Sequence, residues 1–228
     1  MVSSTALPGY RDRMRSVLGV YLVTDEASCA GRSLTDVVMA AVQGGVSCVQ
    51  LREKTLSTRD FCAKASTLQT LLAPLGIPLV INDRVDVALA CGAPGVHLGQ
   101  SDMPVATARK LLPPHVFLGW SVETLDHVAQ ASQAEFEGVD YLGVSPVFST
   151  PTKTDTSTPW GLQGLRQVRA ATALPLVAIG GIHAGNAAEV LAAGADGLAV
   201  VSAICAATAP ALATRELRTL WEQHHDRK

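Results

Sequence analysis

The chain alternates short, continuously apolar runs with longer segments in which apolar residues recur every three or four positions. The short runs lack the polar–apolar alternation of a half-exposed strand, so they are predicted to be strands buried on both faces. Eight such runs are present, at residues 20–23, 46–51, 78–81, 95–98, 116–119, 141–144, 175–179 and 197–201.

The amphipathic segments predict helices between these strands, and typical capping residues mark several helix ends. Ser33 suits a helix N-cap, and Gly44 with Gly45 stops the same helix. Helices are expected at residues 10–18, 33–42, 58–72, 85–91, 105–112, 124–134, 162–171, 186–193 and 209–221, and residues 222–228 are expected to be a frayed tail.

Eight strand–helix units in 228 residues predict an α/β fold, a single (β/α)8 TIM barrel with a short N-terminal helix. A doubly wound open sheet has the same alternation and is the structural alternative. No linker, charge block or low-complexity segment divides the chain. Residues 1–228 are therefore expected to form one barrel domain, with residues 1–17 as an N-terminal extension.

Composition excludes several classes of function. Eighteen Lys and Arg residues against twenty Asp and Glu give a net charge of −2, which argues against binding to nucleic acid or a membrane surface. The five cysteines form no CxxC pair, which favours a reducing compartment. Neither a secretory signal nor a membrane span is indicated, so we expect a cytoplasmic protein. A homo-oligomer is compatible with this composition.

The strand predicted at residues 46–51 ends in polar residues that are spaced by two positions. Gln50, Arg52 and Lys54 point to one face if the extended backbone continues. An Arg and a Lys at the mouth of a buried barrel need an anionic partner, and together they suit a phosphate or diphosphate. The alternative is that Glu53 or another neighbouring acid pairs with them structurally.

Carboxylates follow the third and fourth predicted strands, at Asp83 and Asp102. Neighbouring strands lie about 4.8 Å apart, so two such carboxylates can reach one cation. Two carboxylates with phosphate oxygens and water form the usual environment of Mg²⁺. The alternative is that each Asp caps the helix that follows. Asn82 beside Asp83, and the cationic strand next to it, favour the metal.

The loops after strands seven and eight are the usual phosphate site of (β/α)8 barrels. Here Gly180 and Gly181 allow the backbone to approach a ligand closely, and Val201 and Ser202 follow strand eight. The glycine pair is equally typical of a tight turn. The sequence thus predicts two phosphate sites that face each other across one mouth.

No strong general base is evident in the sequence. His97 lies within an apolar strand and is predicted to be a hydrogen-bonded core histidine, while His183 begins a loop. There is no GxSxG or HExxH motif and no convincing Ser/His/Asp set. A reaction that needs a good leaving group and charge stabilisation, but no strong base, fits this pattern.

The segment 145–156 follows strand six and combines hydroxyl side chains, two prolines and one lysine. By itself it is equally consistent with a solvated surface loop. At this position in a barrel it can reach both phosphate sites, and we expect it to close over bound ligands as a lid.

Several motifs together resemble the thiamine phosphate synthase family, and the resemblance covers residues 21–204. The motifs are VQLREK at 49–54, IND at 81–83, GVHLGQSD at 95–102, GWS at 119–121, PTK at 151–153 and IGGI at 179–182. The resemblance implies that 4-amino-2-methyl-5-hydroxymethylpyrimidine diphosphate is joined to a thiazole phosphate. The products would be thiamine phosphate and pyrophosphate, formed with Mg²⁺ by a dissociative, carbocation-like path.

The resemblance also implies a role for each matched residue. Arg52, Ser121 and Lys153 are the expected catalytic residues, and Asp83 and Asp102 the metal ligands. The pyrimidine diphosphate would be bound by Gln50, Arg52, Lys54, Asn82, Ser121 and Lys153, and the thiazole phosphate by Thr150, Thr152, Gly181, Val201 and Ser202.

Two positions depart from the family pattern. Ser101 stands where an acidic residue is common, and Ser149 where a proline is common; neither removes an expected catalytic group. The alternative functions are a thiazole tautomerase on the same barrel, which would need a base, and a non-enzymatic binder of phosphorylated metabolites. Both a carboxylated and an uncarboxylated thiazole substrate are compatible with the sequence.

Overall fold

The computed structural model describes residues 10–133, 136, 138–150 and 158–226. Its eight parallel strands close into a barrel in which each strand pairs with the next and β8 pairs with β1. This closure confirms the predicted TIM barrel and rules out the open doubly wound sheet. The strands are β1 (Val20–Val23), β2 (Cys48–Leu51), β3 (Leu79–Asn82), β4 (Gly95–Leu98), β5 (Phe117–Val122), β6 (Tyr141–Val144), β7 (Leu176–Ile179) and β8 (Gly197–Val200).

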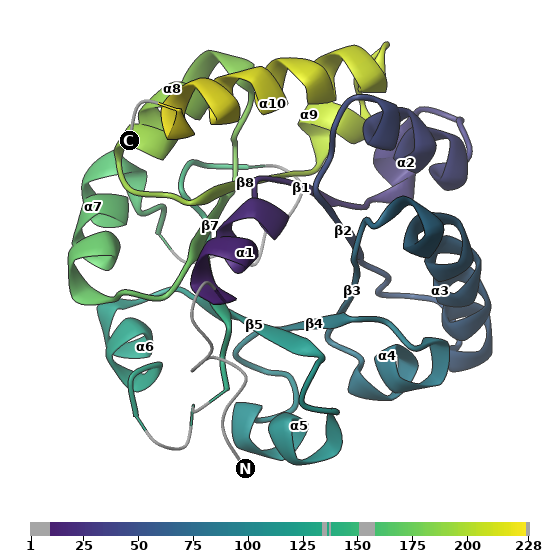
Figure 1. Cartoon of the computed structure of the whole chain (residues 1–228), viewed down its shortest axis with the longest axis horizontal. Helices are drawn as coiled ribbons and strands as arrows, with labels where there is room; N and C mark the ends of the chain where they lie inside the picture. The colour runs from purple at the N-terminus through teal and green to yellow at the C-terminus, as the bar shows by residue number, and fades with distance from the viewer. Residues whose placement is uncertain (1–9, 134–135, 137, 151–157, 227–228) are drawn as a thin grey trace.

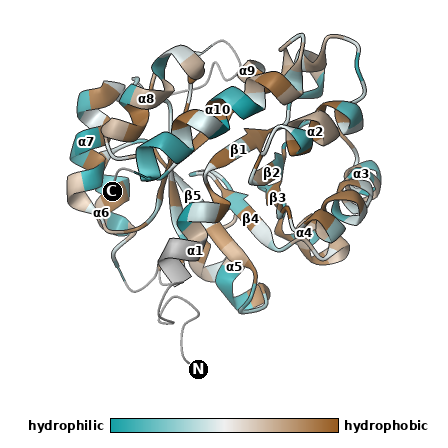
Figure 2. Ribbon diagram, turned by 45° about the horizontal axis from the view of Figure 1, so that its top comes forward, coloured by the Kyte–Doolittle hydropathy of each residue, from teal (hydrophilic) through white to brown (hydrophobic). Residues whose placement is uncertain are grey.

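Helices surround the barrel as an outer layer (Figure 1). Their apolar faces turn toward the strands and their polar faces toward solvent (Figure 2). The α-helices are α1 (Tyr10–Val17), α2 (Leu34–Gln43), α3 (Thr58–Leu72), α4 (Val85–Cys91), α5 (Val105–Leu111), α6 (Leu125–Gln130), α7 (Gly161–Ala171), α8 (Ala184–Ala192), α9 (Ser202–Cys205) and α10 (Pro210–His225), with 3-10 helices η2 (Glu26–Cys29) and η3 (Ala73–Leu75).

Two apolar cores lie on opposite sides of the strand layer. Along β1, Val20 and Leu22 pack toward the helices, whereas Tyr21 points into the barrel interior. Met14 and Leu18, within and just after α1, belong to the same interior cluster as Tyr21. Helix α1 crosses one end of the barrel and closes it (Figure 1). Within the described part of the chain, the cavity opens at the opposite end, where the strands terminate.

Several element boundaries differ from the sequence prediction. Strand β5 continues beyond residue 119 because it pairs with β6 as far as Val122, opposite Val144. Residues 222–225, predicted as a frayed tail, form the last turn of α10. There Arg218 pairs with Glu222 and the ring of His225 stacks on Trp221. Neither η2 nor α9 was predicted, because a single helical turn is too short to show periodicity.

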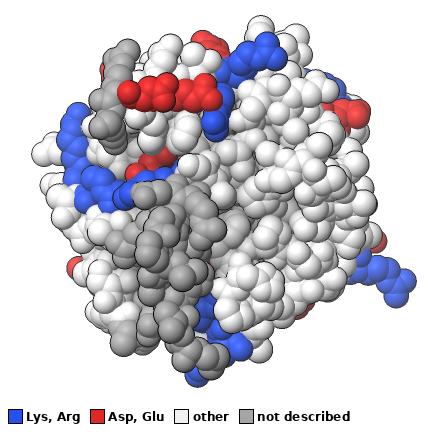
Figure 3. Space-filling view, in the orientation of Figure 1, with Lys and Arg blue, Asp and Glu red and all other residues white. Residues whose placement is uncertain are grey.

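On the face of the molecule that carries α1, charged side chains of both signs lie mainly toward the edges, and a broad area to the right carries few of them (Figure 3). This agrees with the nearly balanced composition of the chain. Over the described part of the chain, no helix combines the length and the apolar character that crossing a lipid bilayer requires.

Asp196, just before β8, ties the closed end of the barrel together. Its carboxylate accepts hydrogen bonds from Arg15 of α1 and Arg169 of α7, each at 3.0 Å, and from the backbone N–H of Leu176 at 2.9 Å. Its backbone carbonyl accepts a hydrogen bond from Trp221 of α10 at 2.8 Å. One buried carboxylate therefore links α1, α7, β7 and β8.

We predict that Asp196→Ala lowers the free energy of unfolding by about 2–4 kcal/mol, because it removes the carboxylate that pairs with Arg169 Nη1 and accepts from the buried Leu176 N–H. Urea unfolding followed by circular dichroism measures the change. The matched control is Glu222→Ala, which removes half of an exposed i,i+4 ion pair and should cost about 0.5 kcal/mol or less. Equal effects of the two substitutions would contradict the role of Asp196.

Candidate active site

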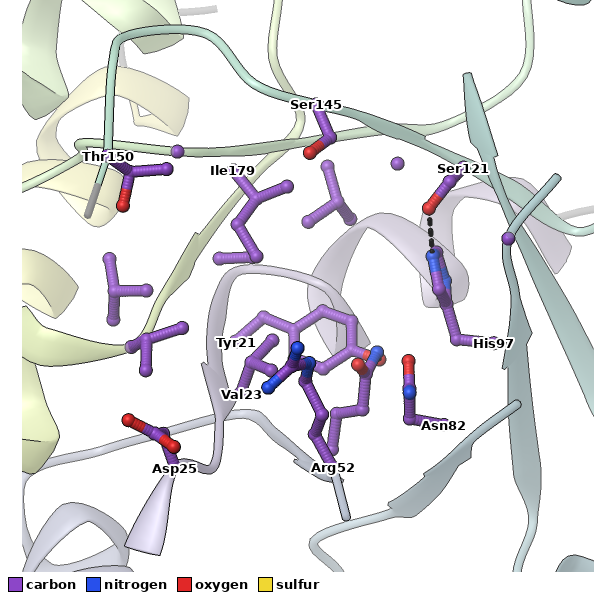
Figure 4. A pocket seen from close by; sticks show the side chains of 18 of the residues that line it. Tyr21, Val23, Asp25, Arg52, Asn82, His97, Ser121, Ser145, Thr150 and Ile179 are labelled. Atoms are coloured by element: carbon purple, nitrogen blue, oxygen red, sulfur yellow. Dashed lines mark hydrogen bonds between the residues drawn. The ribbon is translucent and has the colours of Figure 1, made fainter. Parts of the chain in front are cut away.

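A cavity of about 560 Å³ opens at the carboxyl ends of the strands. Side chains from several strands and the loops after them point into it (Figure 4). Two of the predicted site residues, Thr152 and Lys153, lie outside the described residues, as does the second half of the expected lid, residues 151–156. The cavity brings the others together: it is lined by Gln50, Arg52, Lys54, Asn82, Asp83, Asp102, Ser121, Thr150, Gly181, Val201 and Ser202.

The polar residues at the end of β2 all reach the cavity, as their spacing predicts. The backbone N–H of Arg52 donates to Thr24 Oγ1 at 3.1 Å, which fixes the path of the chain beyond the strand. Lys54 Nζ lies 2.5 Å from Asp83 Oδ2. Glu53 instead pairs with Lys64 at 2.6 Å. Glu53 is therefore not the partner of the two cavity cations, and the acid that pairs with Lys54 is the predicted metal ligand.

The two predicted metal ligands are neighbours at the cavity rim. Asp83 follows β3 with a φ of 64°, a conformation that side-chain-bearing residues adopt only when their surroundings impose it. Its backbone N–H bonds to the His97 carbonyl at 2.9 Å. Asp102 Oδ2 accepts from the Gly99 N–H at 2.6 Å. Burial and the adjacent Asp83 carboxyl raise the pKa of Asp102.

Neither aspartate caps the helix that follows it. The N-cap residues of α4 and α5 are Arg84 and Pro104, so the capping interpretation of the two aspartates is wrong. Two carboxylates held close enough for one to raise the pKa of the other are a donor set that fits a hard divalent cation. Among the described residues, no third His, Cys, Asp or Glu gathers with them. The remaining ligands of such a cation would come from substrate and water.

The opposite side of the cavity consists mainly of backbone and small side chains. Gly180 and Gly181 have φ of 106° and 63° and pack against the loop after β6. Ser202 was expected in a loop but begins the one-turn helix α9, preceded by Val201. Thr150 lines the cavity from the loop after β6. This side offers N–H groups and hydroxyls without a formal charge.

Three aromatic residues of the cavity were not predicted as part of the site. Tyr21, His97 and Tyr141 line its floor. The ring nitrogens of His97 contact Tyr141 Oη at 2.9 Å and Ser121 Oγ at 2.8 Å, so the ring is hydrogen-bonded as predicted. It packs against the buried Tyr141 and also borders the cavity, which was not predicted. His183, the second candidate, caps α8 by accepting from the Gly185 N–H.

A closed eight-stranded α/β barrel with a polar cavity at the carboxyl ends of its strands is the architecture of TIM-barrel enzymes. Residues 20–204 match the family model described as thiamine monophosphate synthase. The chain belongs to this family. It is accordingly an enzyme of thiamine biosynthesis, a transferase of the thiamine phosphate synthase type.

Individual relatives agree with this assignment. A thiamine-phosphate synthase from Albidiferax ferrireducens is 68% identical over 96% of this chain and 98% of its own length. One from Leptospira biflexa is 50% identical over 89% of this chain and 97% of its own. Among solved structures, a thiamine phosphate pyrophosphorylase from Pyrococcus furiosus superposes with a TM-score of 0.83 at 38% identity, covering 92% of this chain and 98% of its own.

We predict that Asp102→Asn has opposite effects without and with metal. Without metal, neutralising one of two adjacent carboxylates relieves their repulsion and raises the melting temperature. Mg²⁺ should raise the melting temperature of the unmodified protein, and this stabilisation should be absent in Asp102→Asn, because an expected metal ligand is lost. Thermal unfolding in EDTA and in Mg²⁺ measures both effects. A lower melting temperature in EDTA, or an undiminished Mg²⁺ effect, would contradict the expected pairing of the two carboxylates.

Proposed function

We propose that the chain condenses 4-amino-2-methyl-5-hydroxymethylpyrimidine diphosphate with 4-methyl-5-(2-phosphoethyl)thiazole, or with its 2-carboxy form with additional loss of CO₂, and releases pyrophosphate. The observation that carries this proposal is the division of one cavity into two unlike sides. Arg52, Lys54, Asp83 and Asp102 supply charge on the side of β2–β4, and backbone groups with hydroxyls line the side of β7 and β8.

The charged side suits a diphosphate bound together with Mg²⁺. Asp83 and Asp102 would hold the ion, which supplies charge neutralisation for the departing diphosphate. Arg52 and Lys54 would contact the diphosphate oxygens, with Lys153 as a further contact. Lys54 is paired with Asp83 in the structure, so it would exchange this partner for a phosphate oxygen when the ion takes its place.

The uncharged side suits the thiazole phosphate. Gly181, Val201 and Ser202 would contact its phosphate through N–H groups and a hydroxyl, as in the phosphate site common to these barrels. Thr150, with Thr152, would add hydroxyls from the loop after β6. The pyrimidine ring would then lie over the floor between the two sides, close to Gln50, Asn82 and Ser121.

The reaction needs positions and charges more than proton transfer. The bond between the pyrimidine methylene carbon and the diphosphate oxygen breaks, and its electron pair leaves with the diphosphate. The electron-rich aminopyrimidine carries the positive charge that develops on the methylene carbon. The thiazole nitrogen then donates its lone pair to form the new C–N bond. Because no proton is removed from the nucleophile, no general base is required, and the protein acts by orientation and electrostatics.

The purified protein should release pyrophosphate only when both substrates and Mg²⁺ are present. A coupled pyrophosphate assay run with each thiazole form identifies the acceptor. We predict that Asp83→Ala lowers turnover by roughly 10²-fold or more, because the ion loses a ligand facing the diphosphate.

The matched control is Asp86→Ala. Asp86 lies three residues after Asp83, and its exposed carboxylate pairs with Arg84. This variant should keep turnover within about twofold of the unmodified protein. Failure to form thiamine phosphate under any metal condition would overturn the proposal, and normal activity of Asp83→Ala would remove Asp83 from the site. Proton exchange on a thiazole carboxylate without the pyrimidine would instead indicate the tautomerase.

We also predict that Mg²⁺ and pyrophosphate bind cooperatively. Among the charged residues that line the cavity, Arg52 and Lys54 are outnumbered by Asp25, Asp83, Asp102 and Glu123. Pyrophosphate alone therefore adds negative charge to a site that already carries it, whereas Mg²⁺ at Asp83 and Asp102 offsets that charge. Calorimetric titration with Mg²⁺ should give a higher affinity when pyrophosphate is present, by roughly tenfold. In the control variant Asp86→Ala, pyrophosphate should raise the Mg²⁺ affinity by the same factor. Equal Mg²⁺ affinities with and without pyrophosphate in the unmodified protein would contradict a shared site.

A further inference from the structure

Five polar side chains form a continuous hydrogen-bonded chain across the barrel, beneath the cavity. Gln50 Nε2 donates to Tyr21 Oη at 2.8 Å, and Tyr21 Oη lies 3.0 Å from Tyr141 Oη. Tyr141 Oη lies 2.9 Å from His97 Nδ1, and His97 Nε2 lies 2.8 Å from Ser121 Oγ. The last of these contacts is drawn in Figure 4. This hydrogen-bonded chain connects side chains from β2, β1, β6, β4 and β5, five of the eight strands.

Space for the chain is provided by glycines on β5 and β6. A Cβ atom on Gly119 would lie 2.1 Å from the Tyr141 ring, and one on Gly143 would lie 2.9 Å from the His97 ring. The two tyrosines are almost fully buried, with 1% and 0% of their surface exposed. Buried hydroxyls need hydrogen-bond partners, and here each is provided by the next group of the chain. Both glycines are therefore required for the aromatic rings to meet in the interior.

The amide of Gln50 determines which group donates and which accepts in each bond of this hydrogen-bonded chain. An amide N–H can only donate, so Tyr21 Oη accepts from Gln50 and has one proton to give onward. If that proton goes to Tyr141, then Tyr141 donates to His97 Nδ1, which must be unprotonated. His97 then carries its proton on Nε2 and donates it to Ser121 Oγ. The proton of the Ser121 hydroxyl is left to donate to a ligand in the cavity.

The Cys48 thiol beside Tyr21 is the competing acceptor. If Tyr21 donated to sulfur, Tyr141 could donate to Tyr21, and the remaining bonds could reverse. Sulfur is a weak acceptor compared with a phenol oxygen, so the direction set by Gln50 is favoured. Burial raises the pKa of Tyr21 and of Tyr141 well above the ordinary tyrosine value and also raises the pKa of Cys48. These groups therefore stay neutral near pH 7, and none of them reverses the chain by ionising.

We propose that Tyr21, Tyr141 and His97 are positioning residues that hold His97 as the Nε2–H tautomer and direct the Ser121 hydroxyl proton into the cavity. The chemical identity of the acceptor rests on the proposed function: it is an atom of the pyrimidine diphosphate. The direction of the chain rests only on contacts among the five side chains. The two parts can therefore be tested separately.

The direction is tested by ¹⁵N NMR of the ligand-free protein labelled at histidine. The His97 signals are assigned by their disappearance in His97→Gln, and their coupling pattern shows which ring nitrogen carries the proton. We expect a neutral ring protonated at Nε2. A ring protonated at Nδ1, or at both nitrogens at pH 8, would overturn the proposal. This measurement needs no substrate, so its result is independent of whether the proposed reaction occurs.

The positioning role is tested by a double-mutant cycle on turnover. Tyr141→Phe should lower the turnover number about tenfold in the unmodified protein, but by less than about twofold when Ser121→Ala is already present. Tyr21→Phe interrupts the chain at another link and should behave in the same way. Losses that are equally large with and without Ser121 would overturn the proposal, because they would arise from damage to the fold rather than from the serine.

Phe117→Leu is the matched control for packing. The Phe117 ring lies against Tyr141, with centroids 6.3 Å apart, but it provides no hydrogen bond to the chain. Its effect on turnover should be small and the same in both backgrounds, and melting temperatures identify any variant that is merely unfolded. If the protein forms no thiamine phosphate at all, the proposed function fails while the NMR result still decides the direction of the chain.

Discussion

Closure of the parallel sheet is the constraint on which the rest of the molecule depends. Because β8 pairs with β1, every strand is hydrogen-bonded on both sides and every second side chain must point into a narrow interior. At one end α1 completes this interior with Met14 and Leu18. At the other end the strands terminate, and residues that follow several of them line the same cavity. Residues far apart in sequence therefore meet there without any loop having to span the barrel.

The interior changes from apolar to polar along the barrel axis, and the change occurs within single side chains. Tyr21 and Tyr141 pack their rings into the interior cluster while their hydroxyls reach the hydrogen-bonded chain below the cavity. The floor of the site is thus also part of the core. Such residues contribute to both stability and function. A loss of activity on their substitution is therefore interpretable only when it is measured both with and without Ser121→Ala.

The sequence was sufficient for the barrel and for most of the cavity rim, because both follow from residue order: buried strands are apolar, and polar residues collect where they end. It was not sufficient to predict the aromatic residues at the floor of the cavity. On a strand buried on both faces, Tyr21 and His97 are not distinguished from core residues by any alternation, and their partner Tyr141 is 44 positions beyond His97. The last turn of α10 was missed for a similar reason, since its stacking of His225 on Trp221 adds no apolar periodicity.

The contrast between a charged rim and a neutral floor matches the electrical demands of the proposed reaction. In that reaction negative charge would develop on the departing diphosphate, which we propose is contacted by Arg52 and Lys54, and positive charge would develop on the pyrimidine methylene. A protonated imidazole beneath the pyrimidine would oppose that positive charge. In the proposed direction of these hydrogen bonds, His97 Nδ1 accepts from Tyr141 and the ring carries one proton, on Nε2, which it donates to Ser121. A chain of neutral donors thus provides hydrogen bonds to the substrate without adding a cation where one is forming.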